Sequence, residues 1–158
     1  MGKSEVRESI GLVLVFLGLV FVGMEMRQNT RMMQGQIRNA ITETTVESMG
    51  WVATSESLAE AGVAAGEGTE ALSRVQLMHL IGWFDASFRT WENEHYQNKI
   101  GLFTEDEFLA RRESWRYGLE RVSYRELLWG YWGEIRMTFA PDFRADLDAM
   151  IAEVQEAE

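Results

Sequence analysis

The sequence predicts an all-α protein, and three observations support this fold class. Residues 9–24 contain no charge, and the segments after them repeat apolar residues at helical spacing. The 158 residues include one proline and no run of alternating polar and apolar residues of the kind that forms strands. We expect an N-terminal transmembrane helix that continues into a long stalk helix, packed with a small bundle of about four helices.

The composition excludes several classes of function. The chain has 25 acidic and 15 basic residues, a formal net charge of −10, which argues against nucleic acid as a partner because phosphate binding needs a basic face. It has no cysteine, which excludes disulfides, thiolate metal sites and a cysteine nucleophile. Its length suits one modest domain plus an appendage.

The charge-free stretch reads SIGLVLVFLGLVFVGM over residues 9–24. Sixteen residues of helix extend about 24 Å, and Arg7 and Arg27 can reach the headgroups at either side, so one short span is feasible. A cleaved signal would be followed by small residues in an A-x-A-like order, and a core helix would carry a polar stripe; neither is present. We predict a tail and membrane anchor over 1–26, with the lipid bilayer as a partner.

Two features of this region suggest contacts beyond simple anchoring. Gly11 and Gly18 lie seven residues apart on one helical face, where small residues allow helices to pack closely, although glycine is common in transmembrane helices in any case. Arg27 and Arg31 share a face just past the span, at the level of the lipid phosphates. With Arg7 they are the expected membrane-interface residues, and they either anchor the helix or recognise a lipid or partner.

The basic residues near the span bear on its orientation. Lys3 and Arg7 precede it, and Arg27, Arg31 and Arg38 follow it. The positive-inside rule therefore favours a cytoplasmic C-terminal body. The free amino terminus nearly cancels the difference, so the opposite orientation stays open.

The rest of the chain divides at a glycine-rich stretch. We expect a juxtamembrane stalk helix over 27–60, a Gly/Ala turn over 61–68 and a helical bundle domain over 69–158. The stalk carries a thin stripe that either pairs with another copy or packs on the body of its own chain. This stripe consists of Met33, Ile37, Ile41, Thr44, Ser48 and Val52.

Each helix of the bundle has its own sequence signal. A long amphipathic helix begins near Thr69 and ends before Gly101. Thr104 opens a capping box for the next helix, and an aromatic helix spans 124–135. Pro141 suits the first position of a final helix.

The segment "MEMRQNTRMM", with the pattern that follows it, resembles a family of uncharacterised bacterial proteins. These have one N-terminal transmembrane helix, an R-Q-N-T-R-like juxtamembrane motif and a helical body. The resemblance implies this architecture and no particular activity. The matching residues are Arg27, Gln28, Asn29, Thr30, Arg31, Phe88, Glu92, Tyr96, Gln97, Gly101, Leu102, Trp115, Phe139, Pro141, Phe143 and Asp148.

A search for catalytic patterns yields one E-x-x-H pair, Glu92 and His95. Di-metal bundles use two such pairs, and the other histidine, His79, has Gln76 where a glutamate is needed. Glu94 lies next to the pair but is expected to point elsewhere. The serines have no G-x-S-x-G elbow, and the glycines form no phosphate loop. We therefore predict no enzyme, no cofactor and no metal, with Glu92 and His95 as the alternative metal ligands.

Residues 123–143 are unusually rich in large rings. Trp129 and Trp132 are three apart and can face together, whereas Tyr131 points away from them. Part of these rings should fill the core, and those left exposed would bind a partner.

The leading hypothesis is a non-enzymatic membrane-anchored scaffold or accessory subunit. It would act through helix–helix and aromatic contacts with itself or with a larger membrane complex. The alternative is a membrane-tethered helical sensor or enzyme with a ligand or metal site near Glu92 and His95.

Overall fold

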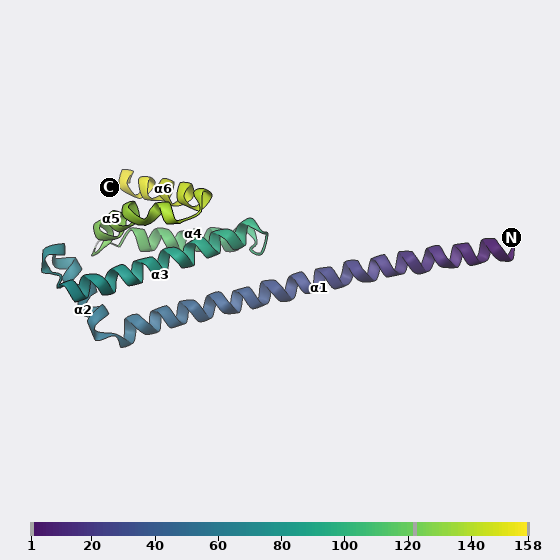
Figure 1. Ribbon diagram of the computed structural model, residues 1–158, viewed down its shortest axis with the longest axis horizontal. Coiled ribbons are helices and arrows are strands. Elements are labelled where there is room, and N and C mark those ends of the chain that lie inside the picture. Colours follow the sequence, from purple (N-terminus) through teal and green to yellow (C-terminus); the bar gives the residue numbers. More distant parts are fainter. Residues whose placement is uncertain (1, 122, 158) are drawn as a thin grey trace. The chain divides into compact units, whose positions relative to one another are not determined.

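The computed structural model describes residues 2–121 and 123–157, and within these ranges it contains helices and no strand (Figure 1). The predicted all-α fold class is therefore confirmed. The helices are α1 (Lys3–Thr54), α2 (Glu56–Glu67), α3 (Arg74–Lys99), α4 (Glu105–Leu119), α5 (Arg125–Ile135) and α6 (Pro141–Glu156), with 3-10 turns η1 (Thr69–Ala71) and η2 (Arg136–Thr138).

The chain forms two units that meet within α1, the first ending at Thr42 and the second starting at Glu43. The first unit is the N-terminal part of α1. Its twelve large apolar side chains between Ile10 and Met24 are 44–72% exposed, so no part of the chain covers them. Across the described ranges, the segment Ile10–Ser48 of this helix is long and apolar enough to cross a membrane, by length and composition.

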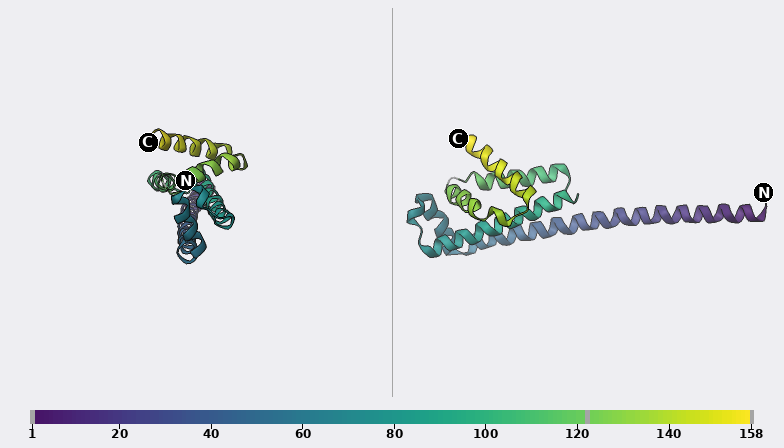
Figure 2. Two further views of the ribbon diagram at one scale, coloured as in Figure 1. Left: turned by 90° about the vertical axis from the view of Figure 1, so that its left-hand side faces the viewer. Right: turned by 45° about the horizontal axis from the view of Figure 1, so that its top comes forward.

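The second unit, which we call the body, is built around α3. Helices α2, α4, α5 and α6 all pack on α3, and Figure 2 shows them gathered as one bundle. The stretch from α3 to α6 contains the four helices that the sequence predicts. The fully buried side chains of the core are Leu80, Phe84, Phe88, Trp115, Leu119, Phe143, Leu147 and Met150.

The helix ends follow from local sequence chemistry. Ser73 caps α3 and Thr104 caps α4, each in a capping box in which the side chain three residues later bonds back to the cap N–H. Gly101, with φ +77°, lies just beyond α3, and Pro141 begins α6. The Thr104 capping box, Gly101 and Pro141 were predicted from the sequence. The start of α3 was not, because the start expected near Thr69 is the short turn η1 and the helix begins at Arg74, after the Ser73 cap.

The structure differs from the expected turn over 61–68. Helix α2 occupies 56–67, and the helical conformation is interrupted on either side of it, at Ser55 and at Gly68. Ala61 and Ala65 are buried where α2 packs on α3, so the small residues serve a close helix contact rather than a turn. The stalk expected over 27–60 is accordingly divided at Ser55, whose side chain accepts the Leu58 N–H and caps α2.

Helix α6 is bound to its neighbours through a row of acidic side chains. Asp142 pairs with Lys99 of α3, while Asp146 and Glu153 pair with arginines of α4. Lys99 lowers the pKa of Asp142 by donating a hydrogen bond to its carboxylate and by its positive charge. Exposed pairs of this kind contribute little to stability because water screens them, so their main effect is on the orientation of α6.

Two glycines in the expected turn give a matched test of the observed helix. Gly62 lies inside α2 with open space around its α-carbon, so Gly62→Ala should raise the free energy of unfolding by about 0.5–1 kcal/mol. Gly68 has φ +127° and ψ 151°, a region that side chains rarely adopt, so Gly68→Ala should lower it by about 1–3 kcal/mol.

Thermal unfolding of the detergent-purified full chain measures both changes. Opposite signs would establish that α2 continues through Gly62. Destabilisation by both substitutions would indicate that residues 61–68 form the turn expected from the sequence and not a helix.

Candidate binding pocket

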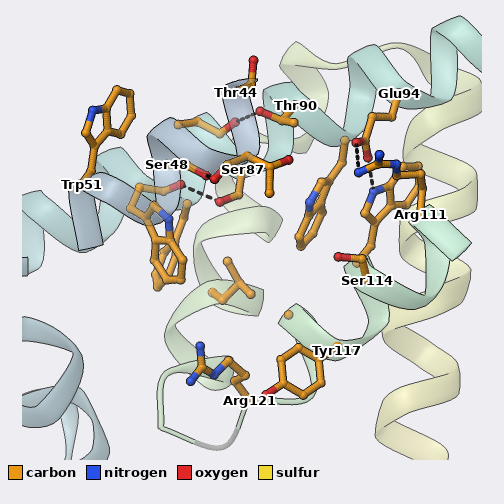
Figure 3. Close-up of a pocket in the computed structure, with 18 of the residues that line it drawn as sticks. Thr44, Ser48, Trp51, Ser87, Thr90, Glu94, Arg111, Ser114, Tyr117 and Arg121 are labelled. Atoms are coloured by element: carbon orange, nitrogen blue, oxygen red, sulfur yellow. Dashed lines mark hydrogen bonds and ion pairs between the residues drawn. The ribbon is translucent and has the colours of Figure 1, made fainter. Parts of the chain in front are cut away.

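A pocket of about 290 Å³ opens in the body between the C-terminal turns of α1, the middle of α3 and α4 (Figure 3). Tyr124 and Leu128 also line it. We call it the aromatic pocket, because its lining includes four of the chain's six tryptophans. These are Trp51, Trp83, Trp91 and Trp115. All of its lining residues belong to the second unit.

The rings of the pocket hold one another in place. Trp91 of α3 stacks on Trp115 of α4, with ring centroids 6.1 Å apart and planes at 21°. Trp83 meets Tyr124 edge to face at 5.3 Å. Gly118 lets the α4 backbone come close to Trp91, because a β-carbon there would lie 3.3 Å from the indole. The wall is therefore packed and preformed.

Glu94 supplies a carboxylate at one end of the pocket (Figure 3). It is 4% exposed, and among the side chains that the structure describes it is the one charged group that is buried. The indole N–H of Trp115 donates to its Oε2 at 2.6 Å, and the Arg111 guanidinium lies 3.6 Å from its Oε1. Burial raises the pKa of Glu94, while the Trp115 hydrogen bond and the Arg111 charge act in the opposite direction.

The remaining polar groups of the pocket are the Glu47 carboxylate, several hydroxyls and one exposed arginine, Arg121. Ser87 and Thr90 donate to carbonyls of their own helix, those of Trp83 and Ala86, each at 2.9 Å. Their oxygens keep the ability to accept a hydrogen bond. Arg121 lies 5.9 Å from the centroids of two tyrosine rings, Tyr117 and Tyr124.

The structure gives Glu92 a structural contact. Its Oε1 accepts the Ala140 N–H at 2.7 Å, just before α6, and its Oε2 accepts from Arg89 at 3.2 Å. Arg89 also lies 3.8 Å from the Phe139 ring centroid and donates to Thr138. Glu92 thus joins α3 to the segment that leads into α6.

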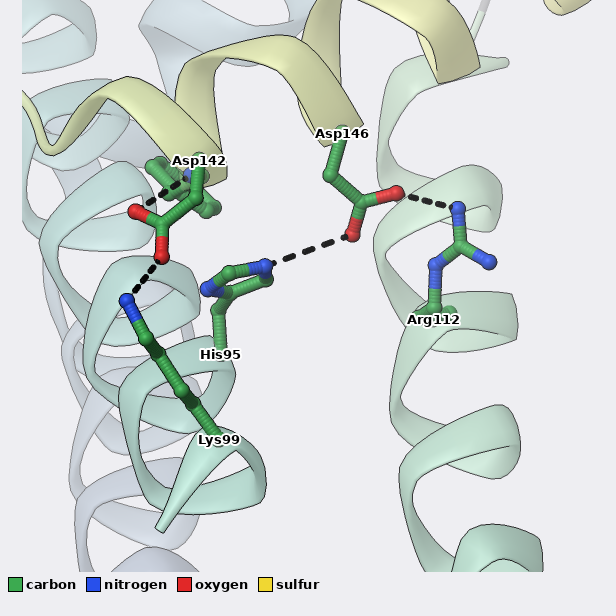
Figure 4. Close-up of polar contacts among 6 residues, drawn as sticks. His95, Lys99, Arg112, Asp142 and Asp146 are labelled. Carbon is green, nitrogen blue, oxygen red and sulfur yellow. Dashed lines mark hydrogen bonds and ion pairs between the residues drawn. The ribbon is translucent and has the colours of Figure 1, made fainter.

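His95 has different partners from Glu92. Its Nε2 lies 3.9 Å from an oxygen of Asp146, which also accepts from Arg112 (Figure 4). The imidazole packs edge to face on Phe108 and Phe143. Over the described parts of the chain, no three histidine or acidic side chains lie close enough to hold a metal ion. The two alternative metal ligands therefore serve helix packing.

The aromatic residues predicted to bind a partner fall into two groups. Trp132 is a core residue, 3% exposed, so its assignment to a partner surface was wrong. Tertiary contacts explain its burial: its indole N–H donates a hydrogen bond to the Asp148 carboxylate at 2.8 Å, and its ring packs on Phe88. Trp129 and Tyr131 are half-buried, and burial raises the pKa of Tyr131.

The predicted residues of the first unit are all accessible. Arg7, Arg27 and Arg31 are exposed. A β-carbon placed on Gly11 or on Gly18 would meet no atom within 4 Å, so their face is open in the single chain.

Sequence reasoning missed Glu94 as a site residue and expected it to point away. One signal was present: Ser87, Thr90 and Glu94 recur at i, i+3 and i+7, a second stripe beside the apolar one on α3. What the stripe faces could not be read, because the partners of Glu94 lie 17 and 21 residues further along the chain.

Comparison of the chain with protein-family models, with curated proteins and with solved structures gave no match. The apolar helix and the aromatic pocket are therefore interpreted from their own chemistry.

Glu94 generates a prediction about stability and pH. A carboxyl whose pKa is raised on folding contributes stability at low pH, and that contribution is lost as the pH rises through the folded value. Glu94→Gln cannot ionise, yet its amide oxygen can still accept from Trp115. The variant should therefore gain stability relative to the wild type as the pH rises from about 4 to about 8.

Thermal unfolding of both proteins across this pH range measures the effect. Glu60→Gln, which neutralises an exposed side chain of α2, controls for the loss of one negative charge. A stability difference that stays constant with pH, or that shifts towards the wild type, would contradict this account of Glu94.

Proposed function

We propose that the protein is a non-enzymatic, membrane-anchored scaffold or accessory subunit. The observation that carries the proposal is the exposure of the twelve apolar side chains between Ile10 and Met24 on every face of the helix. Moving such side chains from water into hydrocarbon is favourable by about 1.5–3 kcal/mol each, which in sum exceeds the stability of a typical domain. The lipid bilayer is the environment that fits this helix.

Charge supports an anchored body that does not lie on the lipid surface. Arg7 and Arg27 bracket about 30 Å of helix, the thickness of a hydrocarbon core. Residues 43–158 contain 22 acidic and 10 basic residues, a net charge of −12, which anionic lipids would repel. The excess of arginine after the span favours a body in the cytoplasm, and the family resemblance implies that the membrane is the bacterial inner membrane.

The body offers a contact surface of the kind that binding proteins use. Trp51 and Tyr117, both at the aromatic pocket, are 51% and 67% exposed. Large exposed rings beside a preformed hollow are typical of the energetically dominant parts of interfaces. The partner would be another copy of the chain or a larger membrane complex.

A membrane-tethered sensor is the second candidate function. The observation that favours it is the aromatic pocket itself, because a small ligand seated on Glu94 would touch both α3 and α4. In this form the ligand site lies at Glu94 and not at Glu92 and His95, whose contacts within the fold are given above.

The native mass of the protein, extracted gently from its own membrane, tests the proposal. Whole multiples of 18.1 kDa are expected if copies associate, and a larger mass that is not a multiple is expected for an accessory subunit. A mass of 18.1 kDa, one chain alone, would contradict both forms of the proposal.

Two glycine variants then separate helix association from contacts of the body. If Gly11 and Gly18 form a packing face, Gly18→Leu should reduce a self-associated mass to the single-chain value. Gly23→Leu is the matched control, since Gly23 lies on another side of the helix and also has open space around it. Equal masses for both variants would assign the association to the body.

A further inference from the structure

We infer that the aromatic pocket binds a small primary ammonium ion that carries a compact apolar group, with the Glu94 carboxylate as its counter-ion. The inference goes beyond the membrane-anchored role and does not depend on it.

The first step is the hydrogen-bonding state of Glu94. Its Oε2 accepts from Trp115, but its Oε1 is 3.6 Å from the Arg111 nitrogen, longer than a hydrogen bond. None of the described residues donates a hydrogen bond to Oε1. A carboxylate that is 96% buried, lines a cavity and keeps one unfilled acceptor oxygen fits a ligand that brings an N–H group.

The second step is the chemistry of the walls. Indole faces attract cations more strongly than other side-chain rings do, and the attraction grows when the cation is removed from water. Trp83 and Trp91 line the pocket on the α3 side, and the same rings offer an apolar surface to the body of a ligand. A second carboxylate, Glu47 on α1, also lines the pocket.

The charges of the pocket argue against an anionic ligand. The two arginines that line it are already engaged, Arg111 with Glu94 and Arg121 with the tyrosine rings. An anion placed among the indoles would face the buried carboxylate. Arg111 is a resting counter-ion that can withdraw, since its side chain is 31% exposed.

The size of the cavity limits the apolar group. A volume of about 290 Å³ corresponds to roughly ten water molecules at about 30 Å³ each. This volume is sufficient for one six-membered ring with a short aminoalkyl chain.

The test is a titration of the full chain in detergent at about pH 8 with phenethylammonium chloride, followed by calorimetry against a micelle blank. One saturable site per chain is expected. Two probes of the same ring size vary the head: trimethyl(phenethyl)ammonium has no N–H, and 3-phenylpropanoate is an anion. The first should bind at least tenfold more weakly than phenethylammonium, and the second should not saturate.

Two substitutions assign the site. Glu94→Gln, which keeps an acceptor for Trp115, should weaken phenethylammonium binding at least tenfold. Glu60→Gln, which changes an exposed side chain of α2, should leave the binding unchanged. Arg111→Gln removes the resting counter-ion and should strengthen binding. Near-ultraviolet circular dichroism checks that each variant keeps its aromatic packing.

The inference is overturned by absence of saturable binding in the wild type, by anion binding as tight as that of the amine, or by weaker amine binding in a folded Arg111→Gln variant. None of these outcomes bears on membrane anchoring, which the native mass tests separately.

Discussion

The position of α3 constrains the rest of the body, because four other helices pack on it. A helix packed in this way must direct large apolar side chains towards its neighbours, and Leu80, Phe84 and Phe88, spaced four residues apart, form the buried face of α3. Any polar side chain on it must find a partner within the protein, since an unpaired buried charge is costly. Glu94 meets this requirement only in part, through one firm hydrogen bond and one long ion pair. The aromatic pocket lies beside this incompletely paired carboxylate, between α3, α4 and the C-terminal part of α1.

The surface pairs and the buried pair have different roles in this arrangement. The carboxylates of α6 that pair with Lys99, Arg112 and Arg116 are partly or largely exposed, so each pair contributes little to stability. Together the pairs favour one orientation of α6 on α3 and α4. Glu94 and Arg111 join α3 to α4 where little water is present, and removal of one partner there leaves an uncompensated charge. A ligand with its own positive charge would have its largest effect at such a pair.

The features that could be predicted from the sequence depend on neighbours close in the chain. Apolar periodicity and caps such as Thr104 and Pro141 act within one or two turns, and they gave the all-α bundle and most helix ends. The features that could not be predicted depend on distant neighbours. The glycines over 61–68 are compatible with either a turn or a close contact between helices. The packing of Ala61 and Ala65 on α3 shows that this segment forms a close helix contact. Trp132 was assigned to the surface because its partner Asp148 lies on another helix. Glu94 was overlooked for the same reason.

The central claim of the proposed function is that the two units of the chain occupy different surroundings, water for the acidic body and hydrocarbon for residues 10–24. The chain has no cysteine, so single cysteines placed at successive positions from 10 to 43 can each carry a spin label in lipid vesicles. If the helix crosses the bilayer, labels at 10–24 will be open to oxygen and closed to a water-soluble nickel chelate at every position. Labels from about 28 onward will be open to the chelate. Accessibility to the chelate that alternates with a 3.6-residue period through 10–24 would mean a helix lying on the membrane surface or on another protein, and would contradict the claim.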